Sequence, residues 1–502
     1  MRSKKKGIVI GAGTAGLASA IRLQNAGFEM EIFEKESGPG GKMTQIKKDG
    51  FSFDLGPTIV MMPEEYMDIF KSCGRNPKDY IEMVKLDPMY NVFFGENLER
   101  KYEVSNDIVK LTSMLENIST DDTEGFFRFL SDIYTRFRIA EKHFIRKSFR
   151  KPSDFFNPKT LVQGLKLKTF DSASNMLSKY VKNKDIQSMF SFQTLYIGVS
   201  PKKGPSLYNI IPMIELLYGI WFIKGGMYSM AKAMEKLFLE LGGKIHYEEE
   251  VEEILFEGES CRGIALKDRD ISSDFVLCND DFPYAVKHLI KDSERKGKYQ
   301  DEKIDSMDYS CSCLIFYFGL QGEVSELEVH NFIISRDIDK NLDQIFEGEK
   351  LEDPSFYLFF PSKIDPSLAP KGHTGMYAFV PVSDLGSAKY EYSAKTIEEY
   401  RSAIINRTKK IPGLDNVEER IVSETVIQPQ DFKEKFHSYN GTCFGLQPTL
   451  TQSNYFRPQP KWKEAEGLYF CGSSTHPGAG VPIVLESGRL ASEEVIKDYG
   501  YE

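Results

Sequence analysis

Residues 7–16 have the sequence Gly-Ile-Val-Ile-Gly-Ala-Gly-Thr-Ala-Gly, and this stretch decides the fold. Its first four residues predict a short buried strand, the glycines that follow predict a tight turn, and the apolar residues of 17–23 fall at helical spacing. A second strand is predicted over 29–33 and leads into Glu34. This order of elements predicts a Rossmann-like domain that binds a dinucleotide: a strand, a glycine turn, a helix, a second strand and an acidic residue.

Each glycine of the turn has its own physical task. Gly11 permits the tight turn, Gly13 lets a pyrophosphate approach the backbone, and Gly16 lets the helix pack closely on the strand. The helix N-terminus offers unpaired N–H groups and the positive end of its dipole to the phosphates. Glu34 is expected to accept hydrogen bonds from both ribose hydroxyls, and its carboxylate would repel a 2′-phosphate. The ligand is therefore expected to be FAD or NAD, and not NADP.

A second glycine pair, Gly40-Gly41, favours FAD over NAD. It follows shortly after the ribose acid, so that another loop can approach the cofactor from the opposite side. Lys42 is expected to face the pyrophosphate or the flavin. The residues of this region expected to contact FAD are Lys35, Gly41, Lys42, Met43, Gly56, Pro57 and Thr58.

The C-terminal part of the chain is expected to close the cofactor site. A strand over 467–472 ends in Gly472, a glycine- and proline-rich loop follows over 475–482, and a helix is predicted over 483–498. Its N-terminus would place Gly480, Val481 and Pro482 near the pyrimidine end of the flavin, where negative charge develops on reduction. His476 is either an acid or base, or a hydrogen-bonding residue that holds the loop.

The middle of the chain indicates further strands of the same domain. Segments 244–247 and 251–254 are expected to pair with each other, and Val251 to contact the adenine through its backbone. Segment 274–279 is expected to return to the same sheet as a buried strand.

Composition excludes several classes of protein. With 502 residues the chain can form two or three domains, and its net charge of −10 argues against a nucleic-acid partner. The seven cysteines form no C-x-x-C pair, so neither a zinc site nor a redox dithiol is predicted.

The N-terminus is basic and then apolar, and in this it resembles a secretion signal. Cleavage there would destroy the glycine turn, so a cytoplasmic location is expected.

Two segments suggest contact with lipid. Residues 143–151 are basic and aromatic, and indicate either a solvated helix face or contact with anionic lipid heads. Residues 205–223 are the most apolar segment but contain Pro212, Glu215 and Gly219, which argues against a membrane span. This segment is expected to line an apolar tunnel or dip into one leaflet, the alternative being an ordinary buried helix.

An α/β protein of three parts is therefore predicted. Residues 1–75, 224–300 and 440–502 are expected to form a discontinuous FAD-binding domain of the glutathione-reductase type. Residues 76–135 and 301–439 are expected to form a substrate domain, because segments of 310–423 alternate apolar and polar as in an antiparallel sheet with one covered face. Residues 136–223 are expected to form a helical, membrane-facing subdomain.

The motifs in residues 54–58, 192–198, 225–228 and 475–482 give the chain a family resemblance. It resembles the bacterial phytoene-desaturase family of FAD-dependent carotenoid desaturases and oxidases over essentially its full length. Residues 56–63, 150–155 and 448–455 are most similar to the members that act on dehydrosqualene.

The resemblance implies an activity. Dehydrosqualene (4,4'-diapophytoene) would lose hydrogens stepwise to give 4,4'-diaponeurosporene in staphyloxanthin-type carotenoid biosynthesis. Such an enzyme takes a long-chain isoprenoid from a lipid surface, so peripheral association with the cytoplasmic membrane is expected. The electron acceptor, a quinone or oxygen, stays open. Glu215 is a candidate base, because a carboxylate in an apolar segment can have a raised pKa. The alternative is a carboxylate at a helix end or at the lipid surface, without a catalytic role.

Large side chains are expected to line the tunnel and to stop a forty-carbon chain; these are Phe192, Tyr196, Tyr218, Trp221 and Phe222. Three other functions are compatible with the motifs. They are oxidation of a terminal carotenoid methyl group by a related enzyme, a non-enzymatic escort for prenylated proteins, and a flavin amine oxidase.

Overall fold

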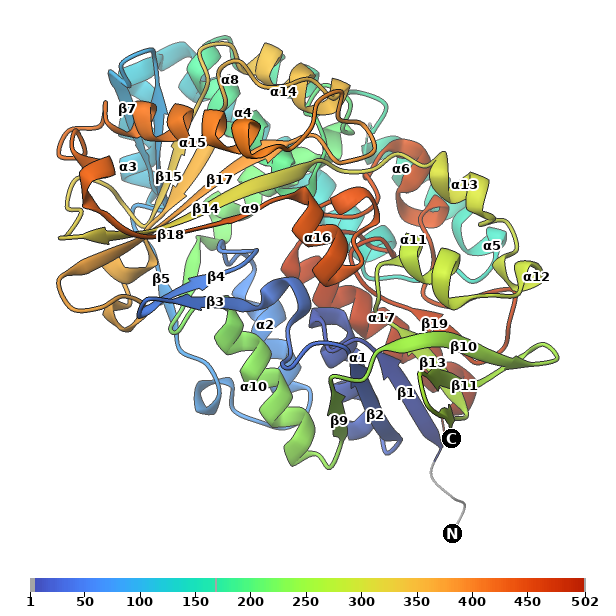
Figure 1. Cartoon of the computed structure of the whole chain (residues 1–502). Coiled ribbons are helices and arrows are strands. Elements are labelled where there is room, and N and C mark those ends of the chain that lie inside the picture. The colour runs from blue at the N-terminus through green and yellow to red at the C-terminus, as the bar shows by residue number, and fades with distance from the viewer. Residues whose placement is uncertain (1–4, 168, 501–502) are drawn as a thin grey trace.

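The computed structural model describes residues 5–167 and 169–500. Figure 1 shows a parallel sheet near both chain ends and a larger sheet on the opposite side of the molecule. The parallel sheet has the order β19-β13-β1-β2-β9, with β1 (Lys6–Ile10), β2 (Glu29–Glu34), β9 (Lys244–Tyr247), β13 (Phe275–Cys278) and β19 (Leu468–Phe470). The predicted first strands and the return of segment 274–279 to this sheet are confirmed.

Helices and a small sheet cover the two faces of the parallel sheet. One face packs against α1 (Thr14–Asn25), α10 (Met227–Glu240) and α17 (Val481–Tyr499). The other face packs against a three-stranded antiparallel sheet of β10 (Val251–Glu257), β11 (Ser260–Leu266) and β12 (Asp270–Ser272).

The predicted pairing of segments 244–247 and 251–254 is wrong. β9 pairs in parallel with β2, whereas β10 pairs antiparallel with β11. Glu248 has a positive φ of 59°, and the chain turns there from one sheet to the other.

The second large sheet has seven strands in the order β18-β14-β17-β16-β15-β6-β7. They are β6 (Tyr90–Phe94), β7 (Arg100–Val104), β14 (Ser312–Gln321), β15 (His330–Ile333), β16 (Phe356–Phe359), β17 (His373–Val382) and β18 (Ile421–Ile427). The expectation of an antiparallel sheet needs a correction, because β6 and β15 run parallel.

Both faces of this sheet are covered, not one. Cys313, Ile315 and Tyr317 of β14 face the interior of the molecule, and the alternating residues between them pack under α14 (Ile338–Glu347) and α15 (Ala394–Thr408). The period-two alternation was visible in the sequence, but the two helices that cover the outer face come from distant segments.

The remaining helices lie mainly over one end of the seven-stranded sheet and along one side of the molecule (Figure 1). They are α2 (Pro63–Lys71), α3 (Ile108–Ile118), α4 (Thr120–Ala140), α5 (Pro152–Phe155), α6 (Pro158–Leu167), α7 (Ala173–Ser178), α8 (Lys184–Ser191), α9 (Ile210–Tyr218), α11 (Phe282–Tyr284), α12 (Ser293–Lys296), α13 (Asp301–Asp305) and α16 (Pro429–Phe436). Two short ribbons, β3 (Gln45–Lys48) with β4 (Phe51–Asp54) and β5 (Met83–Lys85) with β8 (Trp221–Ile223), complete the fold. The boundaries of the three predicted domains stay predictions.

Candidate active site

A cavity of about 530 Å³ extends from the carboxyl ends of β1, β2 and β13 to the inner face of the seven-stranded sheet. Open α/β sheets bind ligands at the carboxyl ends of their strands. Fifteen of the sixteen residues predicted to bind the cofactor line this cavity: Gly11, Gly13, Glu34, Lys35, Gly41, Lys42, Met43, Gly56, Pro57, Thr58, Val251, Gly472, Gly480, Val481 and Pro482.

Gly16, the remaining predicted residue, serves packing. A Cβ at this position would lie 2.2 Å from the carbonyl oxygen of Gly11, so α1 can approach the turn only with a glycine here. Gly11 itself has a φ of +88°, which other residues rarely adopt. The backbone therefore requires glycine at both positions for the reasons that the sequence predicted: a tight turn at Gly11 and close packing of the helix at Gly16.

The two glycine loops lie side by side. Gly40 N donates to Ala12 O over 2.8 Å, and the backbones of Gly13 and Gly40 form a parallel bridge. At Gly480 a Cβ would meet no atom within 4 Å, because this residue borders the open cavity. Glycine backbone from the N-terminal loops and from the C-terminal loop therefore borders the cavity without side chains in between. A pyrophosphate and a flavin ring can approach the backbone closely only at such positions.

Glu34 is oriented by the backbone at the end of β2. Its Oε2 accepts from Ala12 N over 2.7 Å and its Oε1 from Glu36 N over 2.9 Å. Burial raises the pKa of this carboxyl, and the two N–H groups act in the opposite direction. Each oxygen keeps a further lone pair, so the carboxylate can still accept from ribose hydroxyls.

The two predicted lysines differ in their contacts. Lys42 Nζ donates to Thr442 O over 3.2 Å and to Cys443 O over 3.1 Å, and burial lowers its pKa while the nearby Asp281 charge opposes that shift. Lys35 Nζ donates to Glu434 O over 3.1 Å, at the rim of the cavity. Lys42 is thus the buried cation of the site, held where the C-terminal segment crosses the second glycine loop.

Two of the family motifs meet at Asp54. Its carboxylate accepts from Met227 N over 2.9 Å and from Tyr228 N over 3.2 Å, at the start of α10. Burial raises the pKa of Asp54 to about 7. The contact anchors segment 54–58 on the first turn of α10, and that segment forms part of the cavity wall.

The other half of the cavity is apolar and aromatic. Side chains from the sheet face those of α9 and of the short helical segment 192–197 across it. The lining residues of this half include Phe192, Tyr196, Ile210, Ile211, Ile214, Ile315, Phe332, Tyr357, Tyr377 and Phe379. This confirms that segment 205–223 contributes to an apolar cavity, and that Phe192 and Tyr196 line it.

Three predicted lining residues do not reach the cavity. Tyr218 ends α9 at the surface, Trp221 Nε1 donates to Tyr218 O, and Phe222 is buried in β8. Gly219, with a φ of +77°, turns the chain from α9 into β8. None of the three lines the cavity, which the sequence could not reveal without the position of that turn.

Glu215 lies behind the cavity wall. It is fully buried, its Oε2 accepts from Tyr90 Oη over 3.1 Å, and Tyr90 Oη in turn accepts from Gln193 Nε2 over 2.8 Å. Burial raises the pKa of Glu215 to about 8, so the carboxyl is mostly protonated at neutral pH. Its neighbours Ile214 and Tyr196 line the cavity, and its catalytic role stays a prediction.

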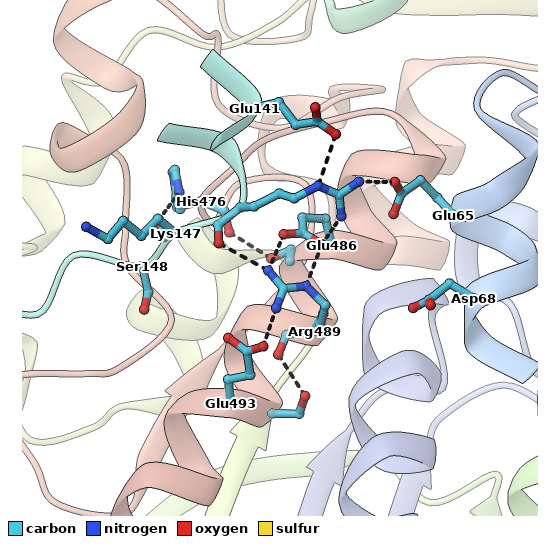
Figure 2. A network of polar contacts seen from close by, with 12 residues as sticks. Glu65, Asp68, Glu141, Lys147, Ser148, His476, Glu486, Arg489 and Glu493 are labelled. Carbon is cyan, nitrogen blue, oxygen red and sulfur yellow. Dashed lines mark hydrogen bonds and ion pairs between the residues drawn. The ribbon is translucent and has the colours of Figure 1, made fainter. Parts of the chain in front are cut away.

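His476 holds the C-terminal loop in place. Figure 2 shows its ring beside Lys147, where Nε2 donates to the Lys147 carbonyl oxygen over 2.9 Å. Burial lowers its pKa to about 4, so the imidazole is neutral, and the side chain does not line the cavity. These contacts fit the role of holding the loop, while a role of His476 as acid or base stays a prediction.

Comparison with known proteins decides the family. The chain matches the family model described as flavin containing amine oxidoreductase over residues 14–496. The chain belongs to this family. It is therefore a flavin-dependent oxidoreductase, and the cavity that the glycine loops border is its FAD site.

Curated relatives agree over the full length. The chain is 44% identical over 494 residues to the 4,4'-diapophytoene desaturase (4,4'-diaponeurosporene-forming) of Staphylococcus haemolyticus strain JCSC1435, covering 98% of each chain. It is 45% identical over 495 residues to the enzyme of the same name from Staphylococcus aureus strain Newman, again covering 98% of each. The resemblance predicted from the motifs is confirmed.

A solved structure shows the same fold at much lower identity. The crystal structure of an oxidoreductase from Methanosarcina mazei superposes with a TM-score of 0.66 at 18% identity, covering 98% of this chain and 100% of the other.

Sequence reasoning missed part of this flavoenzyme's site. Asn279, Asp280 and Asp281 line the cavity directly after β13, and Asn279 Nδ2 donates to Gly11 O over 3.4 Å. Their position after a buried strand was the available signal, since the carboxyl ends of parallel strands share one edge. The aromatic residues of β15 to β17 had no such signal, because their cavity-facing orientation depends on which helices cover the other face.

Proposed function

We propose that this flavoenzyme removes hydrogens stepwise from 4,4'-diapophytoene and forms 4,4'-diaponeurosporene in carotenoid biosynthesis. The observation that carries the proposal is the 44–45% identity to enzymes of that name over 98% of both chains. The cavity supports it, because an apolar, aromatic half adjoins the FAD-binding half, as a hydrocarbon substrate requires.

The chain's own residues orient the substrate and exclude water. A polyene has no polar group to hold it, so alignment must come from close packing against the aromatic wall. When bound, FAD supplies the acceptor for a hydride equivalent from a CH–CH unit. The electron-rich faces of Phe332, Tyr357 and Tyr377 would stabilise the positive charge that develops along the polyene.

A chain of hydrogen bonds fixes the central ring of this wall. Tyr357 Oη lies 2.9 Å from Thr58 Oγ1 and 2.6 Å from His330 Nδ1. Burial lowers the pKa of His330 to about 3, so it is neutral and adds no charge to the apolar wall. Thr58 belongs to the segment expected to contact the flavin, so this chain sets the position of the substrate wall relative to the cofactor.

Expression beside a dehydrosqualene synthase tests the function. We expect yellow pigment whose spectrum shows a longer chromophore and whose mass shows loss of hydrogen without gain of oxygen. Cells with the synthase alone are the control. Gain of oxygen would instead indicate a terminal-methyl oxidase, unchanged substrate with no bound flavin would indicate an escort, and turnover of amines alone would indicate an amine oxidase.

We further propose that the enzyme takes its substrate from a membrane surface through an apolar patch around α6. This patch consists of the exposed side chains of Phe156, Leu161, Val162, Leu165, Phe170 and Phe456. Leu165 is 71% and Phe170 86% exposed, which is costly for a side chain that faces only water. Lys159 and Lys166 of α6 are exposed on the same segment and suit anionic lipid heads.

The patch lies beside residues that line the cavity. Phe155 stacks on Tyr455, and the same small core includes Ile145 and Leu207 of the cavity wall. Tyr208 Oη, also at the cavity, lies 3.0 Å from Ser453 Oγ. A hydrocarbon leaving a bilayer at α6 would therefore reach the cavity over a short apolar path.

This assignment moves the lipid contact away from the two segments that the sequence suggested. In segment 143–151, Arg146 pairs with Glu65, Glu141 and Glu486, and Arg150 pairs with Glu494 and Asp498. These arginines bind the segment to the rest of the molecule. Segment 205–223 is mostly buried. Among residues 5–167 and 169–500, no helix combines the length and the apolar character that a membrane crossing needs.

The same proposed function suggests a role for each part of the fold. The parallel sheet with its three-stranded antiparallel companion corresponds to an FAD-binding domain of the glutathione-reductase type. The helices of residues 136–223 correspond to a membrane-facing subdomain, at the cytoplasmic face of the membrane.

A further inference from the structure

Two cysteines distant in the sequence meet in the cavity wall. The sulfur atoms of Cys313 and Cys443 lie 2.8 Å apart, and 130 positions separate the two residues along the chain. Both residues line the FAD-containing cavity. The absence of a C-x-x-C motif gives no indication of a redox dithiol in the sequence. In the fold, however, β14 and a C-terminal segment bring two free thiols together.

Backbone contacts hold the two segments in this register. Cys443 N donates to Cys311 O over 3.2 Å, and Ser310 N donates to Gly445 O over 2.9 Å. Segment 441–446 therefore runs antiparallel beside the start of β14. Side chains alternate along β14, so Cys313 faces the interior, on the side where Cys443 lies.

The two thiols differ in exposure. Cys313 is fully buried, whereas Cys443 is partly exposed. The Cys443 carbonyl oxygen accepts from Lys42 Nζ over 3.1 Å, which fixes the backbone beside this thiol. Cys443 is thus the thiol that a small oxidant meets first, and Cys313 is placed to react with the product.

We propose that Cys313 and Cys443 form a reversible disulfide in the wall of the FAD cavity. The oxidant is hydrogen peroxide, the compound formed when a reduced flavin passes its electrons to dioxygen. The Cys443 sulfur attacks one peroxide oxygen, the O–O bond breaks, the thiol proton passes to the leaving oxygen, and a sulfenic acid and one water result. The Cys313 sulfur then attacks the Cys443 sulfur, the S–O bond breaks, and a second water leaves. Two thiols lose two electrons and two protons, and one peroxide takes them up.

The disulfide would link the two halves of the cavity wall. It would join β14 of the substrate-side sheet to segment 442–443, whose two carbonyl oxygens hold Lys42. External dithiols would restore the open state by exchange. The proposal concerns the flavin cavity alone and does not depend on which hydrocarbon the enzyme converts.

Peptide mapping of the FAD-loaded enzyme tests the proposal. The reduced protein is treated with a small molar excess of hydrogen peroxide, free thiols are blocked with N-ethylmaleimide, and the digest is analysed without reduction. We expect a cross-linked peptide pair containing Cys313 and Cys443, a mass loss of two hydrogens, and recovery of both thiols on adding dithiothreitol.

Variants separate the pair from other thiols. Cys313→Ala should abolish the cross-link and leave a sulfenic acid on Cys443 that dimedone traps, whereas Cys73→Ala, remote from the cavity, should leave the cross-link unchanged. The flavin absorbance of each variant reports that it is folded. If the folded, flavin-bound parent yields no cross-link between these residues while Cys443 is oxidised or alkylated, the proposal is wrong. A protein that fails to convert diapophytoene yet forms the cross-link would refute the proposed function alone.

Discussion

Glu34 illustrates how one side chain serves both the fold and the cofactor. Its two oxygens accept backbone N–H groups of Ala12 and Glu36 and thereby fix the carboxylate at the end of β2. We expect Glu34→Gln to weaken FAD binding by roughly 1.5–3 kcal/mol, since hydrogen bonds to a charged acceptor are the stronger ones. Titration of the flavin-free protein with FAD, followed by fluorescence quenching, measures the change.

The control for this prediction is Glu36→Gln, which changes a neighbouring carboxylate whose backbone N–H, not its side chain, contacts Glu34. Its FAD affinity should stay close to that of the parent. Equal affinities of the parent and Glu34→Gln would contradict the assigned ribose contact.

Glu215 makes a separate prediction about pH. Its pKa of about 8 in the folded protein exceeds its ordinary value of 4.5. Between these values the folded state holds a proton that the unfolded state has lost, so this group's stabilisation is complete at low pH and is lost as the pH rises toward 8. Within that range the free energy of unfolding should fall by up to about 1.4 kcal/mol per pH unit.

Glu215→Gln should remove this contribution, since an amide keeps the shape without titrating. Urea unfolding at pH 5.5, 7 and 8.5 would show a flatter profile for the variant than for the parent. Parallel profiles would show that the carboxyl titrates normally. A loss of turnover that follows the same titration would in addition support the predicted role of Glu215 in proton transfer.

At the scale of single elements, α6 carries the membrane prediction. We expect Leu165→Glu combined with Phe170→Glu to reduce flotation of the protein with anionic vesicles several-fold, because two large exposed apolar side chains are replaced by like-charged ones. Val422→Glu, at an exposed site in β18 that is 53% accessible, is the matched control. Retained flavin absorbance shows that each variant is folded, and equal flotation of all three proteins would place the lipid contact elsewhere.

The elements around the cavity also decide chain length. Burying hydrocarbon is worth about 0.8 kcal/mol per CH₂, so a site that prefers thirty carbons over forty must obstruct the longer chain. Trp221 and Phe222 do not line the cavity, whereas Leu342 of α14 is a buried residue that does. Leu342→Ala should therefore raise turnover of phytoene relative to diapophytoene, and Trp221→Ala should leave that ratio unchanged. Competition assays on an equal mixture measure it.

The same contrast shows what sequence could and could not predict. The glycine turns and Glu34 act through the local backbone, so their spacing alone placed them correctly at the cavity. The orientation of Trp221 depends on the turn at Gly219, and that of Tyr357 on two covering helices, so no local pattern could assign either. Helices and strands could be predicted where the apolar pattern lies within one segment. The pairing of strands could not be predicted where the partner strand comes from far along the chain, as β2 does for β9.

At the scale of the whole molecule, the FAD site joins three distant parts of the chain: the N-terminal glycine loops, the strand end at 279–281, and the loop 472–484. A ligand that binds only the folded state stabilises it by an amount that grows with its concentration, about 2.7 kcal/mol at one hundred times the Kd. We expect the flavin-free protein to melt at a clearly lower temperature than the loaded one, with a Tm that rises with added FAD. A Tm independent of FAD would mean that the folded state does not bind FAD in preference to the unfolded state.

The position of β19 and α17 has a consequence for the order in which the site can form during synthesis. Segment 468–499 supplies an edge strand of the parallel sheet, a loop of the cavity wall and a helix packed on α1. Ser19 Oγ of α1 donates to the Gly488 carbonyl oxygen of α17 over 3.0 Å, although 469 positions separate the two residues. The first glycine turn therefore leaves the ribosome long before this partner exists, and we expect a chain that stops before Leu468 to be a colourless protein without bound flavin.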